Sequence, residues 1–390
     1  MPRWTVLLVV LLLTAACTPG AAPTPTPAKT AAPPAATATK PAAEPTKPAP
    51  AATPTVGAQP AATATPVPKP AVKPLEPAVM VKIGGTGSLT EAYLYIADAK
   101  GYFAQEGLKA EFIRFRTAAD MVAPLGTGEL SAGGGSPSPG LFNAIARGIP
   151  LKIVADRSTS LPGKANLAIL VRKDLIDAGT IKELRDLKGK TIAINATGSS
   201  TEIALEKALE KGGVKRDEVN VVTMPFPDML PALGNKAIDV AIDVDPYNAL
   251  AQAQGLAVRW KGEDEVYPNH NTSVLLVGKF AQDNPEAAKR LVTAYVRGIR
   301  DYVNAFYKNI GKAEIISILT KATDITDPAL FDKMNIIGVD PDGRVNVQSI
   351  SADHDWYFAK GLMPQKVDVT KVVDHQYVEY AVERLGKYQP

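Results

Sequence analysis

The chain has 390 residues, a formal net charge of +3 and one cysteine. Residues 18–77 hold 46 Pro, Ala and Thr among 60 positions and no aromatic residue, so they cannot bury enough apolar surface to offset the ordering of their backbone. Residues 78–390 are enough for two modest lobes, and their 37 basic and 38 acidic side chains argue against a nucleic-acid-binding surface.

The amino terminus has the parts of an export signal. Arg3 precedes an apolar run at 5–13, and small residues lead from it to Cys17. A membrane span needs about 20 apolar residues, so this run is too short. The ending Leu-Thr-Ala-Ala-Cys resembles the lipobox of bacterial lipoproteins. We therefore expect a signal peptide at 1–16, a lipidated Cys17 and a disordered tether over 17–77; the alternative is a plain secretory signal with a spare thiol.

The folded part contains an internal repeat. Residues 83–91 (IGGTGSLTE) match residues 194–202 (INATGSSTE), and two further pairs of segments match in the same order, at offsets of 108 and 107. Matches in one order with slowly drifting offsets predict two halves that are built alike.

Short β-branched runs, glycine stops and helical spacing place the elements of each half. We expect strands at 79–83, 110–115, 130–134 and 151–155 in the first half and at 191–195, 219–223, 238–242 and 256–260 in the second. Helices join successive strands, so each half is predicted to be a parallel βαβαβαβ unit of an α/β fold. Ser88 with Glu91, and Ser199 with Glu202, have the spacing of capping boxes.

The last third of the chain is predicted to contain a strand at 273–277 and a helix that begins near Asn284. Residues 311–390 show no chemistry in their sequence. We expect them to cover the sheet of the first lobe.

A ligand cleft follows from the predicted topology, because open parallel sheets bind ligands at the carboxyl ends of their strands. Strand ends that lead into Thr-Gly-Ser helix starts offer free N–H groups and the positive end of a helix dipole, which suits an anion. The alternatives are that the serines only cap their own helices and that the glycines only form tight turns. The loop residues predicted to bind the ligand are Thr86, Gly87, Ser88, Gly134, Gly135, Ser136, Thr197, Gly198, Ser199 and Ser200.

Acidic and aromatic residues near these loops are further candidates. Asp243 and Asp245 end a predicted strand, where they would accept hydrogen bonds from an amine or an N–H edge; the alternative is that they are ordinary loop acids. Tyr93, Phe226 and Tyr247 would stack on a planar ligand or wall off an aliphatic one, and core packing is the alternative.

No enzymatic motif in the sequence lies in the structural context that its chemistry requires. Gly189-Lys190-Thr191 precedes a predicted strand instead of following one, which is wrong for a phosphate-binding loop. The three histidines have no metal-binding spacing, and Asp353-His354-Asp355 is predicted to be helix-entry surface. We therefore expect no enzyme activity, no metal and no cofactor.

Three segments, residues 95–112, 184–209 and 230–247, make the chain similar to the nitrate, sulfonate, taurine and thiamine-pyrimidine-precursor group of ABC transporter substrate-binding proteins. The resemblance implies the type II periplasmic-binding architecture, two lobes with mainly parallel sheets and a hinged cleft. Lobe I would take 78–170 and 275–390 and lobe II 171–274, with hinge strands near 167–171 and 273–277.

The resemblance also implies a function. A monomer outside the cytoplasm, held to the membrane through Cys17, would capture a small anionic or zwitterionic organic solute, sulfonate-, taurine- or nitrate-like, and deliver it to a permease with a cytoplasmic ATPase. Many relatives have Glu-Pro where this chain has Asp245-Pro246, which leaves a pyrimidine precursor as an alternative. A pyrimidine-precursor synthase on this scaffold would rely on a cysteine-rich motif and a histidine, and residues 78–390 have no cysteine. A sensor or adhesin without a transporter is a third possibility.

Overall fold

The computed structural model describes residues 72–323 and 325–389. The chain divides into two units, 1–66 and 67–390, and every described residue belongs to the second. The predicted signal peptide, Cys17 and the tether up to residue 71 lie outside the described residues. No helix in the part that is described has the length and apolar character to cross a membrane.

The folded part begins earlier than residue 78. Leu75 is partly buried against the core of the first lobe, and its N–H donates to the carbonyl of Glu106 at 3.3 Å. The carbonyl of Lys73 accepts from Arg290 Nη1 at 2.6 Å. The end of the predicted tether is therefore docked, because Leu75 finds apolar neighbours that its sequence context does not reveal.

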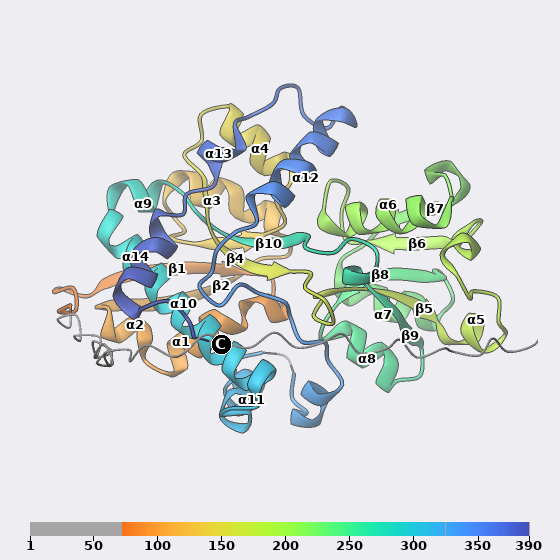
Figure 1. The fold of residues 1–390 in the computed structure, drawn as a ribbon, viewed down its shortest axis with the longest axis horizontal. Coiled ribbons are helices and arrows are strands. Elements are labelled where there is room, and N and C mark those ends of the chain that lie inside the picture. Colours follow the sequence, from red (N-terminus) through yellow and green to blue (C-terminus); the bar gives the residue numbers. More distant parts are fainter. Residues whose placement is uncertain (1–71, 324, 390) are drawn as a thin grey trace, which may run out of the picture. The chain divides into compact units, whose positions relative to one another are not determined.

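Lobe I, on the left of Figure 1, contains two small sheets. β1 (Val79–Gly85) pairs in parallel with β2 (Leu108–Arg114), and a parallel bridge between Ile83 and Ala132 leads toward β3. The second sheet has the order β3-β10-β4, with β10 antiparallel to both neighbours. Its strands are β3 (Gly133–Gly135), β10 (Asn271–Val277) and β4 (Lys152–Thr159).

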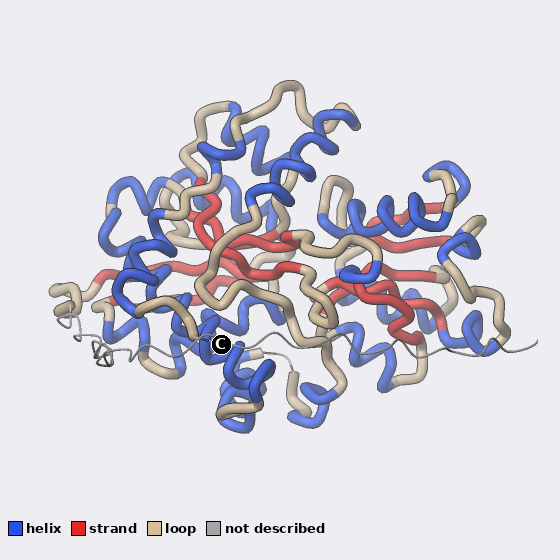
Figure 2. The backbone as a smooth tube through the Cα atoms, in the orientation of Figure 1, coloured by secondary structure: helices blue, strands red, loops and turns tan. Residues whose placement is uncertain are grey.

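Helices cover these sheets (Figure 2), and the long amphipathic α10 (Pro285–Lys308) is central to the lobe I core. The other helices are η1 (Leu89–Glu91), α1 (Ala92–Ala99), α2 (Tyr102–Gln105), η2 (Ala118–Met121), α3 (Val122–Thr127), α4 (Pro139–Ala146), α9 (Lys279–Asp283), α11 (Lys312–Ala322), η6 (Pro328–Asp332), α12 (Val347–Ala359), α13 (Val369–Val372) and α14 (Gln376–Leu385). Residues of the last third pack into the lobe I cores, as expected.

Lobe II, green in Figure 1, has one sheet of order β7-β6-β8-β5-β9. β6 runs parallel to β7 and β8, whereas β5 is antiparallel to β8 and β9. Its elements are β5 (Leu167–Arg172), α5 (Lys173–Asp177), η3 (Leu184–Leu187), β6 (Thr191–Ile194), α6 (Ser200–Gly212), η4 (Arg216–Glu218), β7 (Asn220–Thr223), α7 (Phe226–Gly234), β8 (Val240–Val244), α8 (Tyr247–Ala253), β9 (Ala257–Gly262) and η5 (Glu263–Glu265).

The α/β fold in two lobes is confirmed, but the pairing of the fourth strand in each half was predicted wrongly. β10 lies between β3 and β4, and β5 lies between β8 and β9. Each inserted strand follows a crossing between the lobes and runs antiparallel to its neighbours. The crossings are the segments 160–166 and 266–270. They lie before the predicted hinge strands, because β5 lies wholly in the lobe II sheet and β10 wholly in that of lobe I.

Candidate functional site

A cavity of about 430 Å³ lies between the lobes. Twelve of its 28 lining residues are Ser or Thr and two are Arg. No acidic residue in the described part of the chain lines it. Such a wall is rich in hydrogen-bond donors. The predicted residues that line it are Thr86, Ser88, Gly134, Gly135, Ser136, Thr197, Gly198, Ser199, Ser200 and Phe226.

The lobe I loop after β1 is held by the carboxylate of Glu91. Its Oε1 accepts from the N–H of Thr86 at 3.0 Å and from Arg157 Nη2 at 3.1 Å. The hydroxyls of Ser88 and Thr90 are hydrogen-bonded to each other at 2.7 Å. Gly87 supplies the turn with a φ of +80°, which side chains rarely adopt.

The repeated loop in lobe II is built in a similar way, but the N–H that its glutamate binds lies one position later in the repeat. Glu202 Oε2 accepts from the N–H of Gly198 at 2.7 Å, the hydroxyls of Ser199 and Thr201 are 2.7 Å apart, and Gly198 has a φ of +70°. Each glutamate thus reaches a backbone N–H that precedes the serine, and neither serine side chain caps its helix. The predicted capping boxes were wrong, because the left-handed glycine folds an earlier N–H over the first helical turn.

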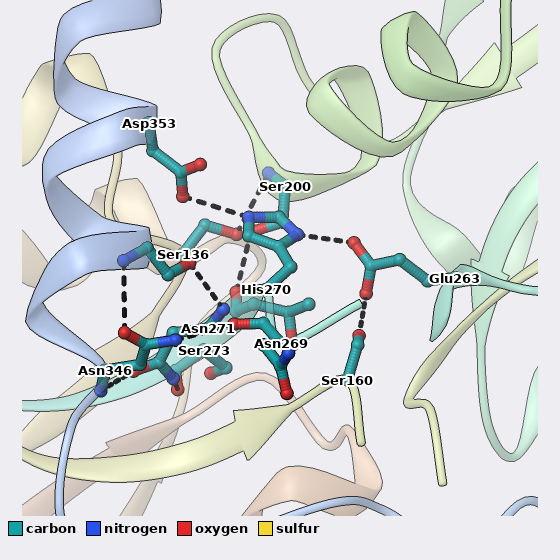
Figure 3. Close-up of polar contacts among 12 residues, drawn as sticks. Ser136, Ser160, Ser200, Glu263, Asn269, His270, Asn271, Ser273, Asn346 and Asp353 are labelled. Carbon is teal, nitrogen blue, oxygen red and sulfur yellow. Dashed lines mark hydrogen bonds and ion pairs between the residues drawn. The ribbon is translucent and has the colours of Figure 1, made fainter. Parts of the chain in front are cut away.

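The two lobes contact each other at the rim of the cavity. The N–H of Ser200 points to the hydroxyl of Ser136 at 3.4 Å, and the hydroxyl of Ser200 donates to the carbonyl of Thr272 at 2.7 Å (Figure 3). Ile203 of α6 is buried in the same cluster as Tyr357 of α12. These contacts bring the two repeated loops to opposite walls of one cavity.

Tyr93 and Gly87 do not line the cavity. The ring of Tyr93 is fully buried and meets the rings of Tyr295 and Tyr302 edge-on, with centroids 5.8 and 5.0 Å away. It lies on the face of α1 that packs on α10. Position 87 instead faces the guanidinium of Arg114.

The two candidate acids are also absent from the lining. β8 extends to Val244, two residues beyond its predicted end, so Asp243 lies inside the strand and is buried. Asp245 Oδ1 accepts from Ala249 N at 3.2 Å and its Oδ2 from Asn335 N at 2.8 Å, which ties α8 to lobe I. Burial raises the pKa of Asp245 to about 6.

Tyr247, the last of the predicted residues, begins α8 beside Asp245. It packs partly buried against the lobe II core, not in the cavity wall.

Arg157 and Asn166 line the cavity but were not among the predicted binding residues. Of these two residues, Arg157 is the more deeply buried. It lies in β4 with 1% of its surface exposed, and its Nη2 donates to Glu91 and, at 3.2 Å, to Thr90 Oγ1. A Cβ at Gly134 would collide with the Arg157 guanidinium, so the glycine makes room for it. An arginine inside an otherwise buried strand was the available sequence signal.

A buried ionic cluster surrounds His270 (Figure 3). His270 Nδ1 is 2.5 Å from Glu263 Oε1, and its Nε2 is 2.9 Å from Asp353 Oδ2. Burial alone would lower the pKa of His270, but the carboxylates of Asp353 and Glu263 raise it to about 10. Asp353 and His354 are buried, so their prediction as surface was wrong. No group of three or more potential metal ligands suits a metal ion within the described ranges.

The sequence comparison decides the family. The NMT1/THI5-like model matches residues 90–305, more than half of the chain. The chain belongs to the NMT1/THI5-like family.

Relatives of this NMT1/THI5-like protein are named for binding and, in one case, for synthesis. A riboflavin-binding protein, RibY, of Chloroflexus aurantiacus is 24% identical over 95% of this chain and 96% of its own length. The taurine-binding periplasmic protein of Escherichia coli is 26% identical over 53% of this chain and 62% of its own. A 4-amino-5-hydroxymethyl-2-methylpyrimidine phosphate synthase of Aspergillus parasiticus is 25% identical over 55% and 62%.

Solved structures share the fold. The alkanesulfonate-binding protein of Xanthomonas axonopodis pv. citri, bound to MOPS, superposes with a TM-score of 0.61 at 21% identity, covering 77% of this chain and 99% of that one. The nitrate-binding protein of Synechocystis PCC 6803 gives a TM-score of 0.65 at 16% identity over 79% and 89%. The NMT1/THI5-like chain therefore has the architecture of periplasmic solute-binding proteins, as expected.

Proposed function

We propose that this protein is the extracytoplasmic solute-binding component of an ABC importer and captures a small anionic or zwitterionic organic solute between its lobes. The observation that carries this is the cavity bordered by two copies of one Thr-Gly-Ser loop, with hydroxyl groups and arginines but no described acid in its wall. Backbone N–H groups at helix starts and hydroxyl donors favour an anion. The names of its relatives support a binding role.

The size of the cavity favours an organic solute over a simple ion. Its volume of about 430 Å³ lies within the range of small-molecule sites. A four-atom anion such as nitrate would fill only a small part of this volume. A sulfonate, taurine-like or carboxylate solute with a carbon chain or ring would fill far more of the space.

The amino terminus predicted from the sequence would hold the protein outside the cytoplasm, at the membrane. A lipid on Cys17 would anchor it, and the Pro-rich tether would let the binding unit sample a volume near the membrane. A permease with a cytoplasmic ATPase would receive the solute, and the binding unit would act as a monomer whose lobes open and close about the two crossings.

A heterocycle is the second candidate. The riboflavin-binding relative matches nearly the whole chain, and Phe226 offers one ring to the cavity wall. A pyrimidine precursor would use the same wall. A synthase activity like that of the fungal relative is less well supported, because residues 78–390 have no cysteine.

The test is to purify residues 72–390 without denaturant, identify any co-purified solute by mass spectrometry, and then measure thermal shifts with sulfonates, nitrate, carboxylates, aminopyrimidines and riboflavin. We expect stabilisation by an organic anion. Stabilisation by riboflavin or aminopyrimidines alone would favour the second candidate, and no stabilisation by any solute would contradict a binding function.

A further inference from the structure

Two polar groups in the cavity wall are buried without a hydrogen-bond partner among the described residues. They are Nε of Arg157 and Oδ1 of Asn166, and these residues are only 1% and 5% exposed. Buried polar atoms are nearly always paired, since leaving one unpaired costs about 1–3 kcal/mol. Both residues line the same cavity.

The hydrogen bonds of Arg157 leave part of its donor set for a ligand. Its Nη2 is engaged by Glu91 and Thr90, and no hydrogen bond holds its Nε. A carboxylate or sulfonate of the solute would accept a charge-assisted hydrogen bond from this Nε. Glu91 Oε1 is shared between Arg157 and the loop N–H of Thr86, so it satisfies the guanidinium from one side only.

Arg157 has room for this role because position 134 lacks a side chain. The guanidinium occupies the space that a Cβ there would take. The other arginine of the lining, Arg116, is exposed at the loop after β2. Arg157 is therefore the buried guanidinium of the site, paired on one side with Glu91. A solute anion would meet its remaining N–H groups away from bulk water, where charge-assisted hydrogen bonds are stronger.

Asn166 presents a hydrogen-bond acceptor, whereas Arg157 presents donors. It ends the first crossing, directly before β5, and its carbonyl oxygen is an unfilled acceptor. An N–H or O–H group on the solute would satisfy it. A solute with an anion alone would leave this acceptor unpaired, and sites with unpaired buried acceptors reject such analogues.

We propose that Arg157 and Asn166 select the solute, an inference that rests on the proposed function. Arg157 binds the carboxylate or sulfonate of the solute, and Asn166 accepts a hydrogen bond from an N–H or O–H group of the same molecule. The substrate class is thereby an organic acid that also carries a donor. Simple alkyl anions and simple amines each satisfy only one of the two residues.

The variants separate this role from the structural role of the Arg157–Glu91 ion pair. Loss of Arg157 alone would leave a buried, unpaired carboxylate and would destabilise the fold. The comparison is therefore between Glu91→Gln and the double variant Glu91→Gln/Arg157→Gln. Both keep an oxygen acceptor for the N–H of Thr86 and differ only at position 157. Because Glu91→Gln leaves the Arg157 cation unpaired, thermal unfolding must show that both variants are folded before their affinities are compared. Asn166→Leu tests the second residue.

Two variants outside the cavity are matched controls. Arg300 also has a buried unpartnered Nε and donates to Asp342 at 2.7 Å. Asn248 also has a buried unpartnered Oδ1. Arg300→Gln and Asn248→Leu report the effect of the same substitutions where no ligand is expected.

Calorimetry with two sets of probes provides the readout. Taurine, ethanesulfonate and ethanolamine share a two-carbon chain; sulfanilate, benzenesulfonate and aniline share a ring. In each set the first compound has both groups, the second only the anion and the third only the donor. Any solute released from the purified protein joins the series.

We expect the compound with both groups to bind best within a set. The double variant should bind the anionic compounds at least tenfold more weakly than Glu91→Gln does. Asn166→Leu should reduce the affinity for the first compound to that for the second, and both controls should bind like the wild type.

Equal anion affinity in Glu91→Gln and the double variant, or a preference for donor-only compounds, would overturn the assignment and leave the binding function standing. If the wild type binds no probe and releases no solute, the proposed function falls and this assignment falls with it.

Discussion

Gly198 of lobe II lies directly against Pro139 of lobe I. A Cβ at position 198 would be 2.8 Å from Pro139 Cγ, closer than real Cβ atoms come, and the φ of Gly198 is +70°. The helix that begins at Pro139 and the loop that precedes α6 thus meet at the cavity rim only because residue 198 has no side chain.

Replacing Gly198 with Ala is expected to hold the two rims apart. We expect the affinity for the solute to fall at least tenfold, or about 1.4 kcal/mol. The left-handed backbone adds strain of about 1–2 kcal/mol to the folded state. Calorimetry gives the affinity and thermal unfolding gives the stability.

Gly213→Ala is the matched control for this substitution. Gly213 has a φ of +66° and nothing within 4 Å of its missing Cβ. It should therefore lose similar stability and keep the wild-type affinity. Equal affinities in the two variants would remove Gly198 from the closing contact.

The hydroxyl of Tyr93 is buried with no hydrogen-bond partner among the described residues. Tyr93→Phe should therefore leave the free energy of unfolding unchanged or raise it by up to about 1 kcal/mol, because it removes an unsatisfied group. The neighbouring Tyr302 is the control: its hydroxyl accepts from Ile337 N at 3.0 Å, so Tyr302→Phe should cost about 1–3 kcal/mol. Chemical denaturation measures both, and a large loss in Tyr93→Phe would contradict the prediction.

The repeated loops could be predicted from sequence because their structure is local. A strand, a left-handed glycine and a helix start follow one another within nine residues in each half, and both copies line the cavity. Phe226 was found for the same reason, since it begins the helix after β7.

The remaining site residues depend on register and on distant neighbours. A shift of two residues in the end of β8 places Asp243 inside the strand, and the face of α1 that Tyr93 occupies is set by α10. Arg157 lines the cavity because a glycine 23 positions earlier leaves it room. The order of the sheets depends on β5 and β10, which the two crossings insert. None of these relationships is visible in a short segment.

His270 is expected to stay protonated well above neutral pH. Its folded-state pKa of about 10 lies above its ordinary value of about 6.5, so the folded state binds the proton more tightly. The stability that the His270 proton contributes is complete below pH 6.5 and is lost as the pH rises toward 10. Nitrogen NMR of the imidazole rings should show both nitrogens of His270 protonated at pH 8.

His354 is the internal comparison for this titration. Burial lowers its pKa, and its Nε2 accepts from Val367 N at 3.0 Å, which requires an unprotonated nitrogen. It should be neutral at pH 7, where His270 is charged. Loss of the His270 proton below pH 7 would show that the two carboxylates do not hold it.

The ion pair between Lys360 of lobe I and Glu206 of lobe II should contribute modestly to closure. Lys360 Nζ is 3.3 Å from Glu206 Oε2, and the two side chains are 45% and 18% exposed. Exposed pairs contribute at most about 1 kcal/mol, so Lys360→Glu should weaken solute binding by about fivefold in dilute salt. At about 1 M salt, where the screening length is about 3 Å, the difference should vanish.

The control is Lys188→Glu, which disrupts a pair with Glu218 wholly inside lobe II and should leave affinity unchanged at both salt concentrations. A salt-independent loss in Lys360→Glu would mean that the substitution acts through packing at the end of α12, since a charge contact between two lobes must weaken when ions screen it.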